Sequence, residues 1–331
     1  MRRFGMRTLP KTLICAVALA LIGIGGAAAQ TYPSRPITII APFPPGGPSD
    51  ALARILSGPL EAALGQPIVI ENIGGAGGTV GVTRVARAEP DGYTLLIGQW
   101  STQVVNPVTY NLSVDVVNDF APIALIANTP QMIIARKDFP ASDVRELIAW
   151  LKTNPDKAQA ATVGAAGGAQ VAGMYFQKIT GTRFGFVPYR GGAAAMQDLM
   201  AGRVDIMFDQ AANAITQVRA STIKAYAVMT EQRWHLAPDI PTIDESGAQG
   251  LHVSYWHALW APKGTPADII AKVNAAVVSA LADPKVQQSF AAQGQDIWPR
   301  EQQSPQALAA LYKAEIEKWW PIIKAEGLKV E

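Results

Sequence analysis

Short apolar runs alternate with longer amphipathic stretches along most of this chain. The runs are rich in isoleucine, valine and phenylalanine, which is typical of strands buried in a sheet. The stretches between them repeat apolar residues at helical spacing, as Leu52, Ile55, Leu56 and Leu60 do. This alternation predicts an α/β fold with two α/β lobes, whose parallel strands are covered by helices on both faces.

The pattern places the elements approximately. We expect strands at residues 37–41, 68–70, 93–97, 123–127, 132–135, 161–164, 184–188, 204–208, 225–229 and 256–261. We expect helices from about residue 49 and at 80–88, 142–152, 170–180, 193–201, 266–282, 284–292 and 305–326. Each of the last three helices begins at or just after a proline, which suits the first helical turn. Gly58-Pro59 predicts a kink or a break in the first helix.

Two loops divide this pattern into lobes. The chain is expected to cross between the lobes near Thr129-Pro130 and again near residues 247–250. Lobe 1 then comprises residues 30–130 plus 250–331, and lobe 2 comprises residues 131–249. A C-terminal helical segment returns to pack on the first lobe, and a ligand cleft is expected between the lobes.

Residues 1–29 have the pattern of a secretory signal peptide. A basic start precedes an apolar stretch at residues 13–24 and three alanines that end at Ala29. The apolar stretch is shorter than the ~18 residues that span a membrane. The pattern predicts export to the periplasm with cleavage after about Ala29. Cys15, the single cysteine, lies in this segment, so thiol chemistry is excluded for the mature protein.

Removal of this segment changes the charge of the protein. The segment holds four of the 28 basic residues and none of the 26 acidic ones, so 24 basic and 26 acidic residues remain. The basic character therefore belongs to the precursor, and the near-neutral mature chain argues against nucleic-acid binding.

The loop at residues 42–50, Pro-Phe-Pro-Pro-Gly-Gly-Pro-Ser-Asp, follows the first strand and opens the first helix. Ligands of open α/β sheets bind beyond the carboxyl ends of strands, and a helix start offers free N–H groups to an anion. Gly46 and Gly47 would let the backbone approach a carboxylate closely. The residues alone leave open an ordinary turn capped by Ser49 or Asp50.

Similar glycine-rich turns recur at residues 71–79 and 164–170. They are not dinucleotide fingerprints, because Val80 stands where Gly75-x-Gly77 would require a third glycine. A Gly-Lys-Ser/Thr phosphate loop is also missing from the sequence. Nucleotide binding is therefore disfavoured, and no cofactor is expected.

An ordered set of motifs resembles one known family. The set contains Pro-Phe-x-Pro-Gly-Gly-x-x-Asp, Ile-Glu-Asn-x-x-Gly-Ala-Gly-Gly, Asn-Pro at 106–107, Val-Pro-Tyr-Arg-Gly at 187–191, Asp-Ile-Met-Phe-Asp at 205–209 and Pro-x-x-Pro-Thr at 238–242. The chain is thus similar, over nearly all of its mature length, to the solute receptors of tripartite tricarboxylate transporters, often called Bug or TctC-like proteins. The resemblance implies a bilobal, periplasmic-binding-protein-like fold that closes over a small organic carboxylate.

The resemblance also implies a binding site. In that family the backbone of the first loop, here residues 43–47, holds one carboxylate, and the second-lobe glycine loop, here residues 167–170, helps to hold the other end. Asp209 would line the cleft and accept a hydrogen bond from the ligand or a water. An N-cap role for Asp209, before a helix starting near Ala211, is an equal alternative.

Two departures from the family pattern bear on the ligand. Gln103 stands where many relatives have histidine, and Trp100 precedes the serine at 101. The second-lobe loop likewise lacks the relatives' serines and histidine. If Trp100 faces the cleft it would stack on a flat acid, which favours an aromatic or medium-chain dicarboxylate over citrate. The alternative is that Trp100 packs in the core beside its strand.

These arguments predict a ligand-binding receptor without a catalytic or metal-binding group, and a periplasmic enzyme on a similar fold is the alternative. A Gly-x-Ser-x-Gly elbow is missing, and His252 and His257 are poorly spaced to bind one metal ion. Expected partners are a small carboxylate and membrane transporter subunits, or a sensor kinase that receives the ligand; the protein is expected to be a monomer. The predicted ligand-binding residues are Phe43, Pro45, Gly46, Gly47, Ser49, Trp100, Ser101, Gly167, Gly168, Ala169, Gln170 and Asp209.

Overall fold

The computed structural model describes residues 32–330, so the predicted signal peptide lies outside the described residues. Residues from Arg35 onward form one compact unit. Within the described residues, ten strands form one sheet. Eight of them follow the order β2-β1-β3-β9-β4-β7-β5-β6, and β8 and β10 pair with β4 outside this order. The alternation of strands and helices confirms the predicted α/β class.

Lobe 1 is built mainly from the first and last parts of the chain. Its elements are β1 (Ile37–Ala41), α2 (Pro48–Leu64), β2 (Ile68–Asn72), the short turn η1 (Ala76–Gly78), α3 (Thr79–Ala86), β3 (Thr94–Gln99), the π-helical turn η2 (Ser101–Val105), α4 (Asn106–Thr109), α9 (Ala267–Leu281), α10 (Pro284–Ala292), β10 (Asp296–Ile297), η3 (Arg300–Gln302) and α11 (Pro305–Ala325). β1 pairs with β2 and β3 in parallel, because the helices between them carry the chain back across the sheet.

Lobe 2 is built from the middle of the chain. Its elements are α5 (Val144–Thr153), β5 (Gln159–Val163), α6 (Gly168–Thr180), β6 (Gly185–Tyr189), α7 (Gly192–Met200), β7 (Ile206–Gln210), α8 (Ala211–Arg219) and β8 (Ile223–Val228). β5 pairs in parallel with both β6 and β7.

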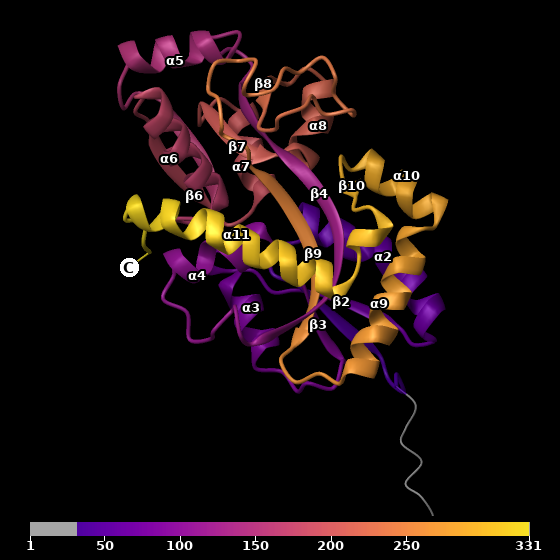
Figure 1. Cartoon of the computed structure of the whole chain (residues 1–331). Helices are drawn as coiled ribbons and strands as arrows, with labels where there is room; N and C mark the ends of the chain where they lie inside the picture. Colours follow the sequence, from indigo (N-terminus) through magenta and orange to yellow (C-terminus); the bar gives the residue numbers. More distant parts are fainter. Residues whose placement is uncertain (1–31, 331) are drawn as a thin grey trace, which may run out of the picture. The chain divides into compact units, whose positions relative to one another are not determined.

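The long strand β4 (Phe120–Arg136) runs from lobe 1 into lobe 2, and β9 (Ser254–Pro262) pairs with its lobe 1 part. They run side by side and antiparallel, and Figure 1 shows them in magenta and orange. The sequence predicted two strands in place of β4, at residues 123–127 and 132–135, with the crossing between the lobes near Thr129-Pro130. The structure has one strand, and Pro130 lies where β4 leaves β9 and begins to pair with β7 and β8. A missing N–H is tolerated at such a change of partner.

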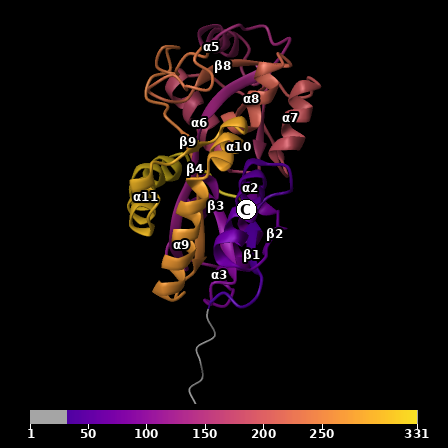
Figure 2. The same ribbon diagram turned by 90° about the vertical axis from the view of Figure 1, so that its right-hand side faces the viewer.

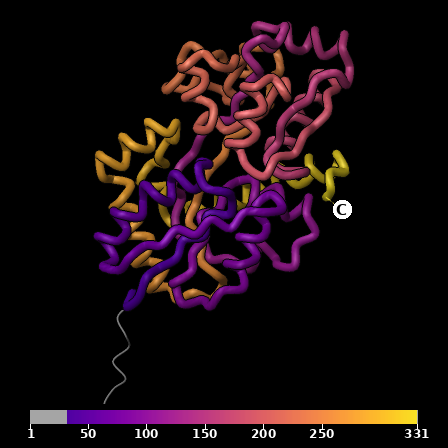
Figure 3. Tube along the Cα trace, turned by 180° about the vertical axis from the view of Figure 1, so that it is seen from behind, coloured from indigo at the N-terminus to yellow at the C-terminus, as the bar shows by residue number. Residues whose placement is uncertain are grey.

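The helices cover both sides of these strands. In Figure 2 α11 lies on one side of β4 and β9, and α2 lies on the other. Figure 3, seen from behind, shows the indigo segment that contains α2 below the salmon segment that contains α7 and α8. α2 continues through Gly58-Pro59 without interruption. Leu60 and Leu64, which follow the proline, are buried, and their packing offsets the lost helical hydrogen bond.

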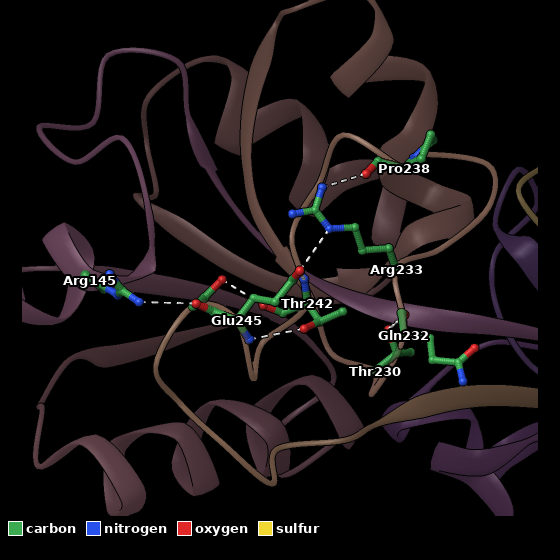
Figure 4. Close-up of polar contacts among 8 residues, drawn as sticks. Arg145, Thr230, Gln232, Arg233, Pro238, Thr242 and Glu245 are labelled. Carbon is green, nitrogen blue, oxygen red and sulfur yellow. Dashed lines mark hydrogen bonds and ion pairs between the residues drawn. The ribbon is translucent and has the colours of Figure 1, made fainter.

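The connection from β8 back to β9 is held by hydrogen bonds around Glu245, which Figure 4 draws as sticks. The Glu245 carboxylate accepts from the Thr242 N–H at 2.8 Å, and the Thr242 hydroxyl accepts from the Glu245 N–H at 3.2 Å. Arg233 donates to the same carboxylate and to the Pro238 carbonyl, both at 2.9 Å. The Pro-x-x-Pro-Thr motif thus fixes the returning chain beside the end of β8, where Thr242 pairs with Val228.

Candidate functional site

A cavity of about 300 Å³ lies where the carboxyl ends of strands from both lobes meet the starts of helices. Loops after β1, β3, β5, β6 and β7 contribute to it, together with one residue of β9. Its lining residues are Phe43, Pro44, Pro45, Gly47, Pro48, Ser49, Gln99, Ser101, Val163, Ala169, Arg190, Gly191, Gly192, Ala193, Ala194, Asp209, Gln210, Asn213 and Tyr255. Strand ends of an α/β sheet are where ligands of this fold class bind.

The loop before α2 presents its backbone to this cavity. Gly46 has φ +88°, a left-handed conformation that favours glycine, and Gly47 is the N-cap of α2. No side chain caps the helix; the Asp50 carboxylate accepts from the Gly46 N–H at 2.9 Å instead. The turn capped by Ser49 or Asp50 that the sequence left open is therefore not formed.

Asp50 organises this loop and is not among the cavity-lining residues. Arg54 donates to its other oxygen at 2.9 Å and also reaches the Asn72 amide oxygen at 3.1 Å. Asn72 in turn donates to the Phe43 carbonyl at 3.2 Å. Burial of the carboxyl opposes ionisation, but these hydrogen bonds outweigh it and hold the pKa of Asp50 below its ordinary value. The charged network fixes the loop that lines the cavity.

In the described part of the chain, four helices start at the cavity without a hydrogen bond from the side chain of their N-cap residue. They are α2, α6, α7 and α8, whose N-caps are Gly47, Gly167, Gly191 and Gln210. At α8 the Ala212 N–H is already paired, because it donates to the Thr129 hydroxyl at 3.1 Å. The first N–H groups of a helix have no partner within the helix, and the helix dipole places partial positive charge there. Their convergence on one cavity favours an anionic ligand.

Asp209 is the one acidic side chain that lines the cavity among the described residues, and it is 6% exposed. Its carboxylate accepts from the Gln210 N–H at 2.8 Å and from the Asn213 amide. Burial raises the pKa of Asp209 to about 7, although these hydrogen bonds act in the opposite direction. α8 begins at Ala211, so Asp209 lines the cavity and also binds the N–H of the residue that caps this helix.

Several lining residues were missed by the sequence analysis. Gln99 and Gln210 meet across the floor of the cavity, where Gln210 donates to the Gln99 amide oxygen at 3.2 Å. Tyr255 comes from β9, far away in the sequence. Arg190, which is exposed, is the one cation in the lining among the described residues. The Val-Pro-Tyr-Arg-Gly motif gave a signal for Arg190, since it follows a strand and precedes a glycine pair.

The predicted ligand-binding residues fall into two groups. Phe43, Pro45, Gly47, Ser49, Ser101, Ala169 and Asp209 line the cavity, whereas Gly46, Trp100, Gly167, Gly168 and Gln170 are not in its lining. Trp100 is fully buried, and its ring makes edge contacts with Tyr255 at 5.3 Å and with Trp319 at 5.1 Å between ring centroids. Trp100 thus packs in the core behind Tyr255, and it is Tyr255 that lines the cavity.

The two glycines at the start of α6 allow close packing. A Cβ added at Gly168 would collide with the Tyr255 hydroxyl and the Trp100 ring, and one at Gly167 would collide with the Val163 carbonyl. Gln170 points back along the chain, where its amide oxygen accepts from the Ala166 N–H at 2.8 Å. These residues set the position of α6, whose start reaches the cavity through Ala169.

The lobes contact each other beside the cavity. Tyr110 of lobe 1 donates to the Ala165 carbonyl of lobe 2 at 2.5 Å. A Cβ added at Gly164 would lie only 2.9 Å from the Gly77 Cα, so backbones of the two lobes touch there. The structure therefore has the lobes closed around the cavity.

Within residues 32–330, no group of three His, Cys, Asp or Glu side chains is placed to hold a metal ion. His257 is fully buried, and burial lowers its pKa to about 3. No helix in this part of the chain is long and apolar enough to cross a membrane.

Comparison with known proteins agrees with this geometry. Residues 52–328 match the model of a family described as tripartite tricarboxylate transporter family receptor. The periplasmic binding protein BugD is 39% identical with a TM-score of 0.84, over 90% of this chain and 100% of its own. MatC from Rhodopseudomonas palustris with bound malate is 36% identical with a TM-score of 0.85, over 88% of this chain and 100% of its own. A second R. palustris protein, solved with adipate, is 29% identical with a TM-score of 0.85, over 90% of this chain and 100% of its own.

Proposed function

Because the chain belongs to the tripartite tricarboxylate transporter receptor family, we propose that it captures a small organic carboxylate outside the cytoplasm and releases it unchanged. The proposed ligand is a di- or tricarboxylate or an aromatic acid, and the receiving partner is a membrane transporter of the tripartite type. We propose that the protein is a monomeric receptor and not an enzyme.

The observation that carries this proposal is the convergence of three uncapped helix starts, those of α2, α6 and α7, on one cavity. Unpaired N–H groups on both lobes can each hold a carboxylate oxygen, and a ligand that bridges them stabilises the closed lobes. Arg190 adds a positive charge to the lobe 2 side of the cavity. A ligand with two separated carboxylates would engage the helix starts of both lobes at once.

Two further observations support a dicarboxylate. The ligands named for the two R. palustris relatives, malate and adipate, are both dicarboxylates of modest size. Asp209 disfavours a second anion at its own position, because two buried carboxylates repel each other. We therefore place the ligand's carboxylates at the helix starts and an uncharged or donor group beside Asp209.

The location of the protein and the movement of its lobes are also part of this function. We propose that residues 1–29 direct export to the periplasm and are removed after about Ala29. We also propose that residues 30–130 plus 250–331 move as lobe 1 and residues 131–249 as lobe 2 when the ligand enters. β4 would form one part of the hinge, since it pairs with β9 in lobe 1 and with β7 in lobe 2, and the second crossing near residues 247–250 would form the other.

A thermal-shift screen tests this function. Malate, succinate, adipate, citrate, benzoate and several amino acids are added to the mature protein, and the melting temperature is measured. A ligand that binds only the folded state stabilises it by about 3 kcal/mol at a concentration of 100 times Kd, and this added stability raises the melting temperature. A screen in which no carboxylate raises it would contradict the proposal.

Arg190 offers a matched pair of variants for the same assay. Arg190→Ala removes the cation of the cavity, whereas Arg183→Ala removes an exposed arginine that pairs with Asp156 elsewhere on lobe 2. We expect the first variant to weaken carboxylate binding about tenfold and the second to leave it unchanged, since a charge-assisted contact contributes about 1.5–3 kcal/mol at most. Equal affinities for both variants would remove Arg190 from the site.

A further inference from the structure

Among the described residues, Tyr255 is the one residue of β9 that lines the cavity. Its side chain is 5% exposed, and its ring makes an edge contact with the fully buried ring of Trp100. Its backbone lies opposite Thr129 of β4 in the sheet. The strand pairing and the contact with Trp100 hold the ring in place, so the position of its hydroxyl is fixed.

The Tyr255 hydroxyl lies against the start of α6. A Cβ added at Gly168, the first residue of this helix, would come within 2.2 Å of the hydroxyl oxygen. α6 has no side-chain cap, and the Val171 N–H is the first of its N–H groups with a backbone partner, the Gly167 carbonyl at 3.0 Å. The N–H groups before it are free to bind an anion. Donors of two kinds, N–H and O–H, thus meet at one end of the cavity.

This hydroxyl has no hydrogen-bond partner in the described part of the chain, and its oxygen keeps accessible surface, whereas the Trp100 indole nitrogen is sealed off. Other tyrosine hydroxyls are used within the protein: those of Tyr226 and Tyr312 donate to backbone carbonyls. Burial raises the pKa of Tyr255, and the charge of Asp209 raises it further, so the hydroxyl keeps its proton. A donor that the protein leaves unpaired in the wall of a cavity indicates an acceptor on the occupant.

Asp209 is not that acceptor in this structure. Its carboxylate accepts from the Gln210 N–H at 2.8 Å and from the Asn213 amide, and it makes no hydrogen bond with Tyr255. The acceptor that Tyr255 lacks is one that the free N–H groups of α6 also attract, and these groups favour an anion.

We propose that the Tyr255 hydroxyl donates a hydrogen bond to the ligand carboxylate that is held at the start of α6. The inference rests on the proposed function, since it takes the ligand to be a carboxylate in this cavity. A hydrogen bond to a carboxylate is charge-assisted and stronger than one to a neutral acceptor. Because Trp100 supports the ring from behind, Tyr255 also sets how far this carboxylate enters the cavity.

Calorimetric titration of Tyr255→Phe with malate, adipate and benzoate tests the contact. Phenylalanine keeps the ring that packs on Trp100 and removes only the hydroxyl. We expect the affinity for each acid that binds the wild type to fall about tenfold, at the lower end for a hydrogen bond to a charged group. The melting temperature of the ligand-free variant should not fall, because the hydroxyl has no partner in the described protein to lose.

Tyr226→Phe is the matched control. Tyr226 is buried in lobe 2 outside the cavity lining, and its hydroxyl donates to the Ala141 carbonyl at 2.8 Å. Its loss should lower the melting temperature of the ligand-free protein and leave the affinity for all three acids unchanged. The two variants are therefore expected to show opposite patterns of stability and affinity.

Three results would overturn the inference while the proposed function stands. The first is wild-type affinity of Tyr255→Phe for every acid that binds. The second is a weaker affinity accompanied by a lower melting temperature of the ligand-free variant, which would make the hydroxyl structural. The third is an equal loss of affinity in Tyr226→Phe. If the folded wild type binds no carboxylate at all, the proposed function itself is wrong, and the inference is wrong with it.

Discussion

Asp209 should make the stability of this protein depend on pH in a way that one substitution removes. Its carboxyl is 6% exposed, and burial raises its pKa from an ordinary value of 3.8 to about 7. Between these two values the folded protein keeps a proton that the unfolded chain has released. The contribution of Asp209 to the free energy of unfolding therefore falls as pH rises through this interval and levels off above about pH 7.

The magnitude follows from the size of the shift. Each pH unit changes the free energy of unfolding by about 1.4 kcal/mol, so an interval of about three units corresponds to about 4 kcal/mol. Asp209→Asn cannot ionise but can still accept from the Gln210 N–H. The free energy of unfolding of this variant should lack the contribution of Asp209. The difference in free energy of unfolding between wild type and variant should therefore change by about 4 kcal/mol between about pH 4 and about pH 8.

Urea denaturation of both proteins across this pH range measures the difference directly. Asp138→Asn is the control: Asp138 is exposed, and its hydrogen bond with Arg136 lowers its pKa, so the variant should not reproduce the effect. If the difference in free energy of unfolding between wild type and Asp209→Asn stays constant with pH, the prediction is wrong. Asp209 would then have the same pKa in the folded and the unfolded protein.

Three further substitutions test the packing around the cavity. Gly168→Ala places a methyl group against the Tyr255 hydroxyl and the Trp100 ring, and it should lower the free energy of unfolding by about 1–3 kcal/mol in denaturation; an unchanged value would show that α6 shifts freely. Gly46→Val forces a branched residue into a left-handed conformation at the cavity loop, so ligand titration should show lost carboxylate binding while circular dichroism shows a folded protein. Trp100→Ala removes a fully buried indole and should cost about 3–5 kcal/mol in denaturation. If Trp100 also supports a flat ligand through Tyr255, aromatic acids should lose more affinity in this variant than aliphatic acids, and equal losses would count against that prediction.

Much of the fold could be predicted because its elements are strongly patterned. β1 lies at the predicted residues 37–41, and α10 at the predicted residues 284–292. The pattern could not predict that β4 and β9 run antiparallel to their neighbours, because apolar periodicity carries no information on strand direction. It also split β4 at Pro130, since a proline only breaks a strand where its N–H is needed for pairing.

The site was predictable to the extent that it is local in the sequence. Gly47, Ser49 and Ala169 lie in glycine-rich turns after strands, and these turns line the cavity. Gln99, Gln210 and Tyr255 reach the cavity only because the ends of β3 and β7 meet the beginning of β9 there, and no local pattern marks this. The burial of Trp100 behind Tyr255 also depends on tertiary contacts, here with α11 through Trp319.

Calorimetric titration of the mature protein with malate and adipate, followed by NMR of the recovered ligand, distinguishes capture of a carboxylate from its turnover. We expect saturable binding of at least one dicarboxylate at one site per chain, with the ligand recovered chemically unchanged. If the folded protein binds neither of these acids nor any other carboxylate, or if the ligand is recovered as a different compound, the proposed function is wrong.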